Sequence, residues 1–209
     1  MNFVWSPDGQ RLAFSRPDSV GVLEFKDGLM NPLLEITPLQ TGEDWAWVPG
    51  VAWGSDGKIL YTVSHEAPED SQLFNLAAIP VDGGAPLQLS QESGMFAYPA
   101  ISPLQPLPIG EDAYQVAYLR AVFPRQSKSS PYRLVVMDRD GSNQKILFPP
   151  QGEPGLEPQQ VVWSPAPMPG DGIYTLAILY QGNFWLVNSL AGEAQQITGD
   201  SLIKRITWR

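Results

Sequence analysis

Short stretches of alternating apolar and polar residues follow one another along the whole chain and are separated by turns rich in Gly, Pro and Asp. Alternation of this kind is typical of half-buried β-strands, whereas an amphipathic helix repeats its apolar residues every three to four positions. No stretch combines such a helical period with capping residues. The pattern therefore predicts an all-β protein.

A longer repeat organises these strands. Residues 3–15 read Phe-Val-Trp-Ser-Pro-Asp-Gly-Gln-Arg-Leu-Ala-Phe-Ser, and residues 51–63 read Val-Ala-Trp-Gly-Ser-Asp-Gly-Lys-Ile-Leu-Tyr-Thr-Val. Looser copies begin at positions 99 and 161, and the beginning of a fifth lies at 206. The anchor positions of the five copies, spaced 48, 48, 62 and 45 residues apart, are Trp5, Trp53, Ile101, Trp163 and Trp208.

Each copy predicts a four-stranded unit. In Ser-Pro-Asp-Gly the proline presets φ for a turn, and glycine suits the positive-φ position that follows, so the first two strands form a hairpin. The expected third and fourth strands are 20–25 and 33–37, 73–81 and 86–89, 132–137 and 145–148, and 183–188 and 194–197. Four short strands in a period of about 40–50 residues are the signature of a propeller blade.

The repeat also resembles a known family. The string from Trp5 to Phe14, followed by an Asp-Gly turn and by the strand ends Gln88-Leu89-Ser90 and Gln196-Ile197-Thr198, is similar to TolB-like (WD-repeat-like) β-propeller repeats. The chain departs from that pattern at Gly54-Ser55, where Ser-Pro is lost, and at Ile101, where tryptophan is lost. The resemblance implies a β-propeller fold and favours an extracytoplasmic, periplasmic location.

The expected blades are 1–38, 50–90, 98–149 and 160–198, with an extra strand at 203–208. Propellers have about four to eight blades, and a closed four-bladed ring has no use for the extra strand. Three alternatives follow. The chain is part of a longer propeller, or it closes by pairing its terminal strand with the first unit, or it forms a homodimer through its terminal strands and so completes a larger ring.

Composition excludes several function classes. With 13 basic and 22 acidic residues the formal net charge is -9, which argues against a nucleic-acid partner. The absence of cysteine excludes a disulfide framework, a thiolate metal site and a cysteine nucleophile. The longest apolar stretch, 173–180, is too short to span a membrane, and the first residues lack the features of a signal peptide. The protein is therefore either cytoplasmic or a piece of a longer chain whose export signal lies upstream.

The residues that could carry chemistry are few. The Asp-Arg-Asp-Gly-Ser-Asn run at 138–143 resembles the start of a calcium loop, but it lacks the distal Glu and falls where a hairpin turn is due. His65, the single histidine, has no second His or Cys with which to hold a transition metal. Neither a Gly-x-Ser-x-Gly elbow nor a glycine-rich phosphate loop is present. We therefore expect no catalytic residue, no metal and no cofactor.

The loops offer a better candidate site. Residues 42–49 join the first unit to the second, and this loop should meet the loops 65–72 and 120–133 at one mouth of the central channel. The last of these is basic in an otherwise acidic protein, with Arg120, Arg125, Lys128 and Arg133. The expected ligand-binding residues are Trp45, Trp47, His65, Arg120 and Arg125. In the alternative interpretation, Trp45 or Trp47 plugs the channel or packs between blades, and the repeat tryptophans are inter-blade core.

The sequence thus favours a non-catalytic binding module that presents its channel-mouth loops to a protein or peptide partner. Two alternatives are a propeller domain or fragment of a larger hydrolase, similar to prolyl oligopeptidase, and a carbohydrate-acting enzyme. A hydrolase domain downstream would favour the first of them, and a metal at His65 the second.

Overall fold

The computed structural model describes residues 1–26, 28–105, 113–170 and 172–206. Within these residues the chain forms four antiparallel sheets of four strands each, and in every sheet the strand order follows the sequence. This arrangement confirms the predicted all-β fold with about four four-stranded blades.

The strands are short and evenly distributed. The first sheet holds β1 (Asn2–Trp5), β2 (Leu12–Ser15), β3 (Ser19–Glu24) and β4 (Leu29–Glu35), and the second holds β5 (Val51–Trp53), β6 (Ile59–His65), β7 (Phe74–Pro80) and β8 (Leu87–Ser90). The third holds β9 (Ala100–Ile101), β10 (Gln115–Ala121), β11 (Tyr132–Asp138) and β12 (Lys145–Phe148), and the fourth holds β13 (Val162–Trp163), β14 (Thr175–Tyr180), β15 (Asn183–Asn188) and β16 (Ala194–Gln196). A 3-10 turn, η1 (Pro124–Gln126), lies between β10 and β11. Among the described residues no helix is long and apolar enough to cross a membrane.

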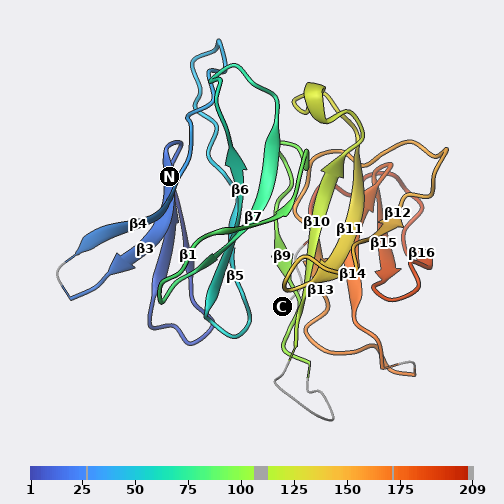
Figure 1. The fold of residues 1–209 in the computed structure, drawn as a ribbon. Coiled ribbons are helices and arrows are strands. Elements are labelled where there is room, and N and C mark those ends of the chain that lie inside the picture. The colour runs from blue at the N-terminus through green and yellow to red at the C-terminus, as the bar shows by residue number, and fades with distance from the viewer. Residues whose placement is uncertain (27, 106–112, 171, 207–209) are drawn as a thin grey trace.

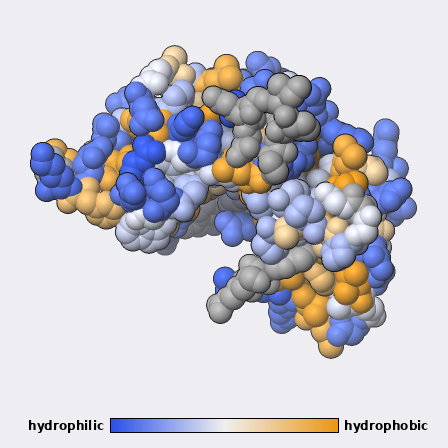
Figure 2. Space-filling view, turned by 90° about the horizontal axis from the view of Figure 1, so that it is seen from below, coloured by the Kyte–Doolittle hydropathy of each residue, from blue (hydrophilic) through white to orange (hydrophobic). Residues whose placement is uncertain are grey.

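The four sheets stand side by side in chain order (Figure 1). Their innermost strands, β1, β5, β9 and β13, contact one another in that sequence. Seen from below, the molecule is an arc that is open on one side (Figure 2). The sheets therefore form a partial propeller, with the first and fourth sheets at its two ends. Residues 203–206 of the expected extra strand belong to none of these sheets, and residues 207 and 208 lie outside the described part.

The Ser-Pro-Asp-Gly turn behaves as its chemistry predicts. Gly9 has a φ of 68°, and its N–H donates to the Ser6 carbonyl at 2.9 Å. The Ser6 hydroxyl donates to the Asp8 carboxylate and accepts from the Arg11 N–H, which fixes the hairpin between β1 and β2. The hydrogen bond from Ser6 holds the pKa of Asp8 below its ordinary value.

The apolar core consists of two clusters that share the third sheet. One cluster spans the first three sheets and includes Tyr118 and Val135 of the third. The other joins the third sheet to the fourth and includes Leu119 and Leu134. Successive residues of a strand point to opposite faces, so neighbouring residues of β10 and β11 enter different clusters.

The repeat tryptophans join one sheet to the next. Trp53 and Trp163 are 5% and 7% exposed, and their indole Nε1–H groups donate to the Val4 and Ala100 carbonyls of the preceding sheet, at 2.9 and 3.0 Å. Trp5 is the exception to the predicted inter-blade role, because no sheet precedes the first: it is 58% exposed and stacks on Phe25.

The contact between the second and third sheets is built differently, because the side chain of Ile101 has no N–H group to donate. Tyr61 and Tyr114 place their hydroxyls 3.0 Å apart, and Tyr61 donates to the Arg139 carbonyl. Tyr114 also donates to Asp56 at 3.4 Å. Burial raises the pKa of Tyr114 to about 12, so the hydroxyl stays protonated at any ordinary pH. At this contact, tyrosine hydroxyl groups supply the hydrogen bonds that a tryptophan indole supplies between the first and second sheets and between the third and fourth.

Because Trp53 makes an inter-sheet hydrogen bond and Trp5, among the described residues, makes none, substitutions of Trp53 and of Trp5 should change the free energy of unfolding by different amounts. Trp53→Phe should lower the free energy of unfolding by about 1–3 kcal/mol, since it leaves the Val4 carbonyl without its indole donor and removes buried apolar area. Trp5→Phe, at the same repeat position but exposed, should change it by less than about 0.5 kcal/mol. Urea unfolding followed by circular dichroism measures both values, and equal losses would contradict the assigned role.

Candidate functional site at the channel mouth

Three loops gather at one end of the arc, at the top of Figure 1. They are the segments 36–50 before β5, 66–73 between β6 and β7, and 122–131 between β10 and β11. Gln40 N–H donates to the Glu69 carbonyl at 2.7 Å, and Lys128 N–H donates to the Gln72 side chain at 3.4 Å. The structure therefore brings together the three loops that the sequence placed at the mouth.

Trp45, in the loop before β5, is 39% exposed on this surface. Its indole N–H donates to Glu43 at 2.7 Å, and the Lys128 ammonium lies 5.5 Å from the centre of its ring. Lys128 also donates to the other carboxylate oxygen of Glu43. These two partners hold an aromatic ring in a fixed, partly solvated position between two loops.

The pKa of Glu43 is lowered from its usual value, chiefly by the hydrogen bond from Lys128 and then by the one from Trp45. Both bonds favour the charged carboxylate. The contact between the two loops is therefore strongest when Glu43 is ionised.

Trp47 takes the position that the alternative interpretation foresaw. It is 4% exposed, donates to the Met95 carbonyl at 3.2 Å and packs edge-on against Phe74 at 4.9 Å. In this arrangement the ring cannot reach a ligand at the surface. Trp45 and Trp47 are two residues apart but differ in burial, and the sequence alone does not show which of them is exposed.

His65 also lies beneath the mouth, 2% exposed. Its Nδ1 is 2.7 Å from the Thr37 carbonyl and its Nε2 is 3.0 Å from the Ser71 carbonyl. Since both ring nitrogens face backbone carbonyls, neither is available to a metal or a ligand. The ring ties β6 to the loops on either side of it.

Arg120, Arg125 and Lys128 are exposed and Arg133 is half-buried, and several of these side chains already have partners. Arg125 lies 3.8 Å from Glu92, and the guanidinium of Arg133 donates to the carbonyls of Pro149, Pro150 and Glu153. Arg120, at the end of β10, is exposed. The mouth is therefore a mixed aromatic and charged surface rather than a strongly positive one.

The run at 138–143 is a hairpin turn between β11 and β12. Gly141 N–H donates to the Asp138 carbonyl, Ser142 donates to Asp140, and Asn143 donates to Asp138 at 2.6 Å. The aspartate oxygens accept from neighbouring side chains of the same turn. Within the described ranges, no three His, Asp or Glu side chains are grouped as a metal site would require.

Sequence reasoning missed a cavity on the inner side of the arc. It has a volume of about 390 Å³ and is lined by residues of the innermost strands and the segments that precede them, including Val4, Trp53, Tyr98, Ile101 and Gln160. Strands β1, β5 and β9 line it together with residues 160 and 161, just before β13, which follows from the propeller arrangement. No local motif marks such a cavity, because its walls come from four copies of the repeat.

Comparisons with known proteins agree with the fold. No protein-family model matches the chain, and no curated protein matches it. Among solved structures, a candidate TolB from Agrobacterium tumefaciens is similar with a TM-score of 0.52 and 16% identity, over 95% of this chain and 61% of that one. The β-propeller domain of the Trilobed protease from Pyrococcus furiosus matches with a TM-score of 0.38 and 13% identity, over 95% of this chain and 71% of that one.

The ion pair at the mouth yields a prediction about Glu43. Because folding lowers its pKa, the stability gained from the ionised carboxylate is present above the usual value of 4.5 and is lost as the pH falls through the lower folded value. Lys128→Met should move the pKa of Glu43 back up toward 4.5, which carbon-13 NMR titration of the carboxyl can follow. Lys145→Met, on β12 at a distance from Glu43, is the control, and an equal shift in both variants would contradict the pairing.

The chain spans about three fifths of the Agrobacterium protein that it resembles. The fold is that of a TolB-like β-propeller, present here as four blades of an open ring.

Proposed function

We propose that the chain is a TolB-like binding module that uses its channel-mouth loops to contact a protein or peptide partner. The observation that carries this proposal is Trp45, a partly exposed aromatic side chain fixed by Glu43 and Lys128 from two different loops. Tryptophan is enriched among the residues that dominate binding energy, because it contributes a large rigid contact area at a low entropy cost.

The surroundings of Trp45 also support this function. Loops held by a rigid β-scaffold are a common location for binding residues, and the buried His65 and Trp47 fix the loops from below. Arg120, at the end of β10, and Arg125, in the loop that follows, add exposed positive charge. The mouth loops also carry the exposed carboxylates of Glu66, Glu69 and Asp70, so the surface around Trp45 offers charges of both signs to a partner.

The likeness to a candidate TolB also supports a location outside the cytoplasm. We propose this location together with the binding role. The two proposals are independent, because the mouth loops present the same residues in either compartment.

Trp45→Ala should weaken binding of a mouth ligand at least tenfold. The purified protein is panned against a phage-displayed library of random dodecapeptides, and the enriched peptides are measured by fluorescence anisotropy with the wild type and the variant. Truncating a central aromatic contact typically costs about 2 kcal/mol or more, which is roughly thirtyfold in affinity.

Leu190→Ala is the matched control for this experiment. Leu190 is 64% exposed in the turn between β15 and β16, at the opposite end of the sheets from the mouth loops. Its truncation should leave peptide affinity unchanged. Peptides that bind both variants as tightly as the wild type would place the binding surface elsewhere.

A further inference from the structure

The first sheet carries a continuous apolar row on the face that no other sheet covers. Trp5 pairs with Leu12, Leu12 with Leu23 and Leu23 with Met30, so the four side chains lie side by side across all four strands. Trp5 is 58% exposed, and the neighbouring Phe3 and Phe25 are 50% and 53% exposed. A soluble protein rarely leaves such a patch uncovered without a use for it.

The equivalent rows in the later sheets are buried. In the second sheet Trp53 pairs with Leu60 and Leu60 with Ile79, and these side chains are 5%, 0% and 1% exposed. In the fourth sheet the row runs Trp163, Leu176 and Val187, which are 7%, 0% and 0% exposed. In both cases the covering surface is the preceding sheet. The apolar row Trp5, Leu12, Leu23 and Met30 therefore has the composition of a surface that contacts another four-stranded sheet.

The hydrogen bonds of the buried tryptophans specify what that other sheet must offer. Each indole donates to the carbonyl of the residue just before the anchor position of the preceding sheet, which is Val4 for Trp53 and Ala100 for Trp163. Both acceptor residues pair with an alanine of the next strand, Ala13 and Ala117. The matching surface thus combines a carbonyl at this position with small apolar side chains beside it.

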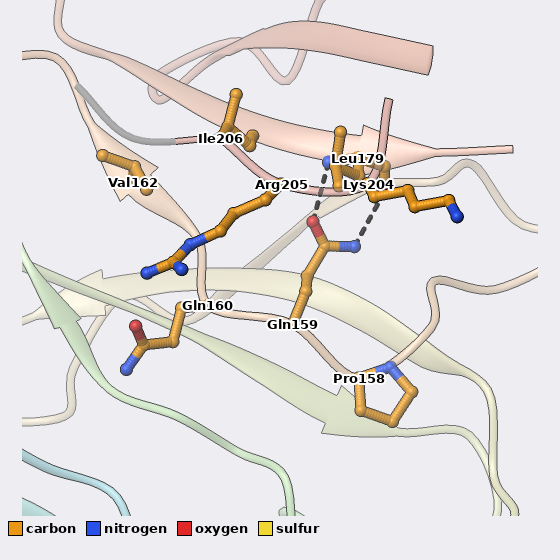
Figure 3. Close-up of a pocket in the computed structure, with 8 residues that line it drawn as sticks. All are labelled: Pro158, Gln159, Gln160, Val162, Leu179, Lys204, Arg205 and Ile206. Atoms are coloured by element: carbon orange, nitrogen blue, oxygen red, sulfur yellow. Dashed lines mark hydrogen bonds between the residues drawn. The ribbon is translucent and has the colours of Figure 1, made fainter. Parts of the chain in front are cut away.

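The far end of the same chain presents this surface. In the fourth sheet Val162 precedes the anchor and pairs with Ala177, which in turn pairs with Leu186, just as Val4 pairs with Ala13 and Ala13 with Val22. A cavity of about 470 Å³ is lined by Gln160, Val162 and Leu179 together with residues 204–206 (Figure 3). Among the described residues, 204–206 line this cavity and Ala177 of the same row is 2% exposed, so this face is partly covered.

We propose that two copies of the chain associate head to tail, so that the first sheet of each covers the outer face of the fourth sheet of the other. In this arrangement the Trp5 indole donates to the Val162 carbonyl of the second copy, and the interface continues the one that already joins the sheets within the chain. Two such contacts close a ring of eight sheets, which lies within the range of about four to eight blades seen in propellers. The segment 203–206, held at its start by the bond from Ile203 N–H to the Gly182 carbonyl, moves aside to admit the second copy.

Sedimentation equilibrium of the full chain tests the association. The expected species has twice the 23.0 kDa of one chain. Trp5→Glu places a charge in the interface and should raise the dimer dissociation constant at least a hundredfold, whereas Leu190→Glu, equally exposed but in a turn away from both end faces, should leave it unchanged. Circular dichroism of Trp5→Glu shows whether the monomer stays folded.

Cross-linking then identifies which faces meet. The chain has no cysteine, so Leu23→Cys and Leu186→Cys each introduce a single thiol, one on each end face. A mixture of the two variants, treated with a short bismaleimide, should form cross-linked pairs, whereas either variant alone should not. Removal of residues 203–209 should leave the dimer intact or tighten it, because it exposes the fourth sheet.

Three results would overturn the proposal. A monomer at all accessible concentrations means that the first sheet has another occupant, and assemblies larger than a dimer mean that the contact does not close a ring. Cross-linking of Leu23→Cys with itself means that the two copies meet through their first sheets instead.

Discussion

Every sheet in this fold depends on its neighbour to cover one of its faces. A four-stranded sheet of this size cannot bury both of its apolar faces alone, so stability comes from the contact between successive sheets. The tryptophan at the end of an inner strand serves this contact in two ways, since its ring fills the space between two sheets and its N–H satisfies a backbone carbonyl. Where the tryptophan is absent, at Ile101, tyrosine hydroxyls and Asp56 supply the polar part of the contact.

This dependence also explains why the mouth can be both exposed and rigid. The loops that carry Trp45 and Lys128 are long and rich in polar residues, yet they rest on side chains buried in the first core cluster. His65, at the end of β6, contacts the Thr37 carbonyl of the loop before β5, and Trp47, within that loop, donates to the Met95 carbonyl between β8 and β9. Trp45 and many polar side chains of these loops are exposed, whereas Trp47 and His65 are buried beneath them.

The repeat made the architecture predictable. The Trp-Ser-Pro-Asp-Gly string fixes the position and the turn type of the first hairpin, and the alternating pattern locates the other strands to within a few residues. The fourth strand of the first unit was expected at 33–37, whereas β4 runs from Leu29 to Glu35 and includes Pro32, where the pairing with β3 shifts its register. The sites were harder, because the burial of Trp47, Trp45 and His65 depends on which loops meet above the sheets, and that information lies outside any one copy of the repeat. Trp5 shows the same limit, since its local sequence matches that of Trp53 and only the absence of a preceding sheet exposes it.

The third sheet separates the two apolar core clusters, and this separation affects how cooperatively the chain unfolds. Side chains on one face of β10 and β11 belong to the cluster of the first three sheets, and those on the other face belong to the cluster of the fourth. The fourth sheet can therefore detach without disrupting the packing among the first three, so local opening at this end costs less free energy than global unfolding. The chain thus consists of a three-sheet unit with a fourth sheet packed against it, and the third sheet contributes side chains to the apolar core of both parts.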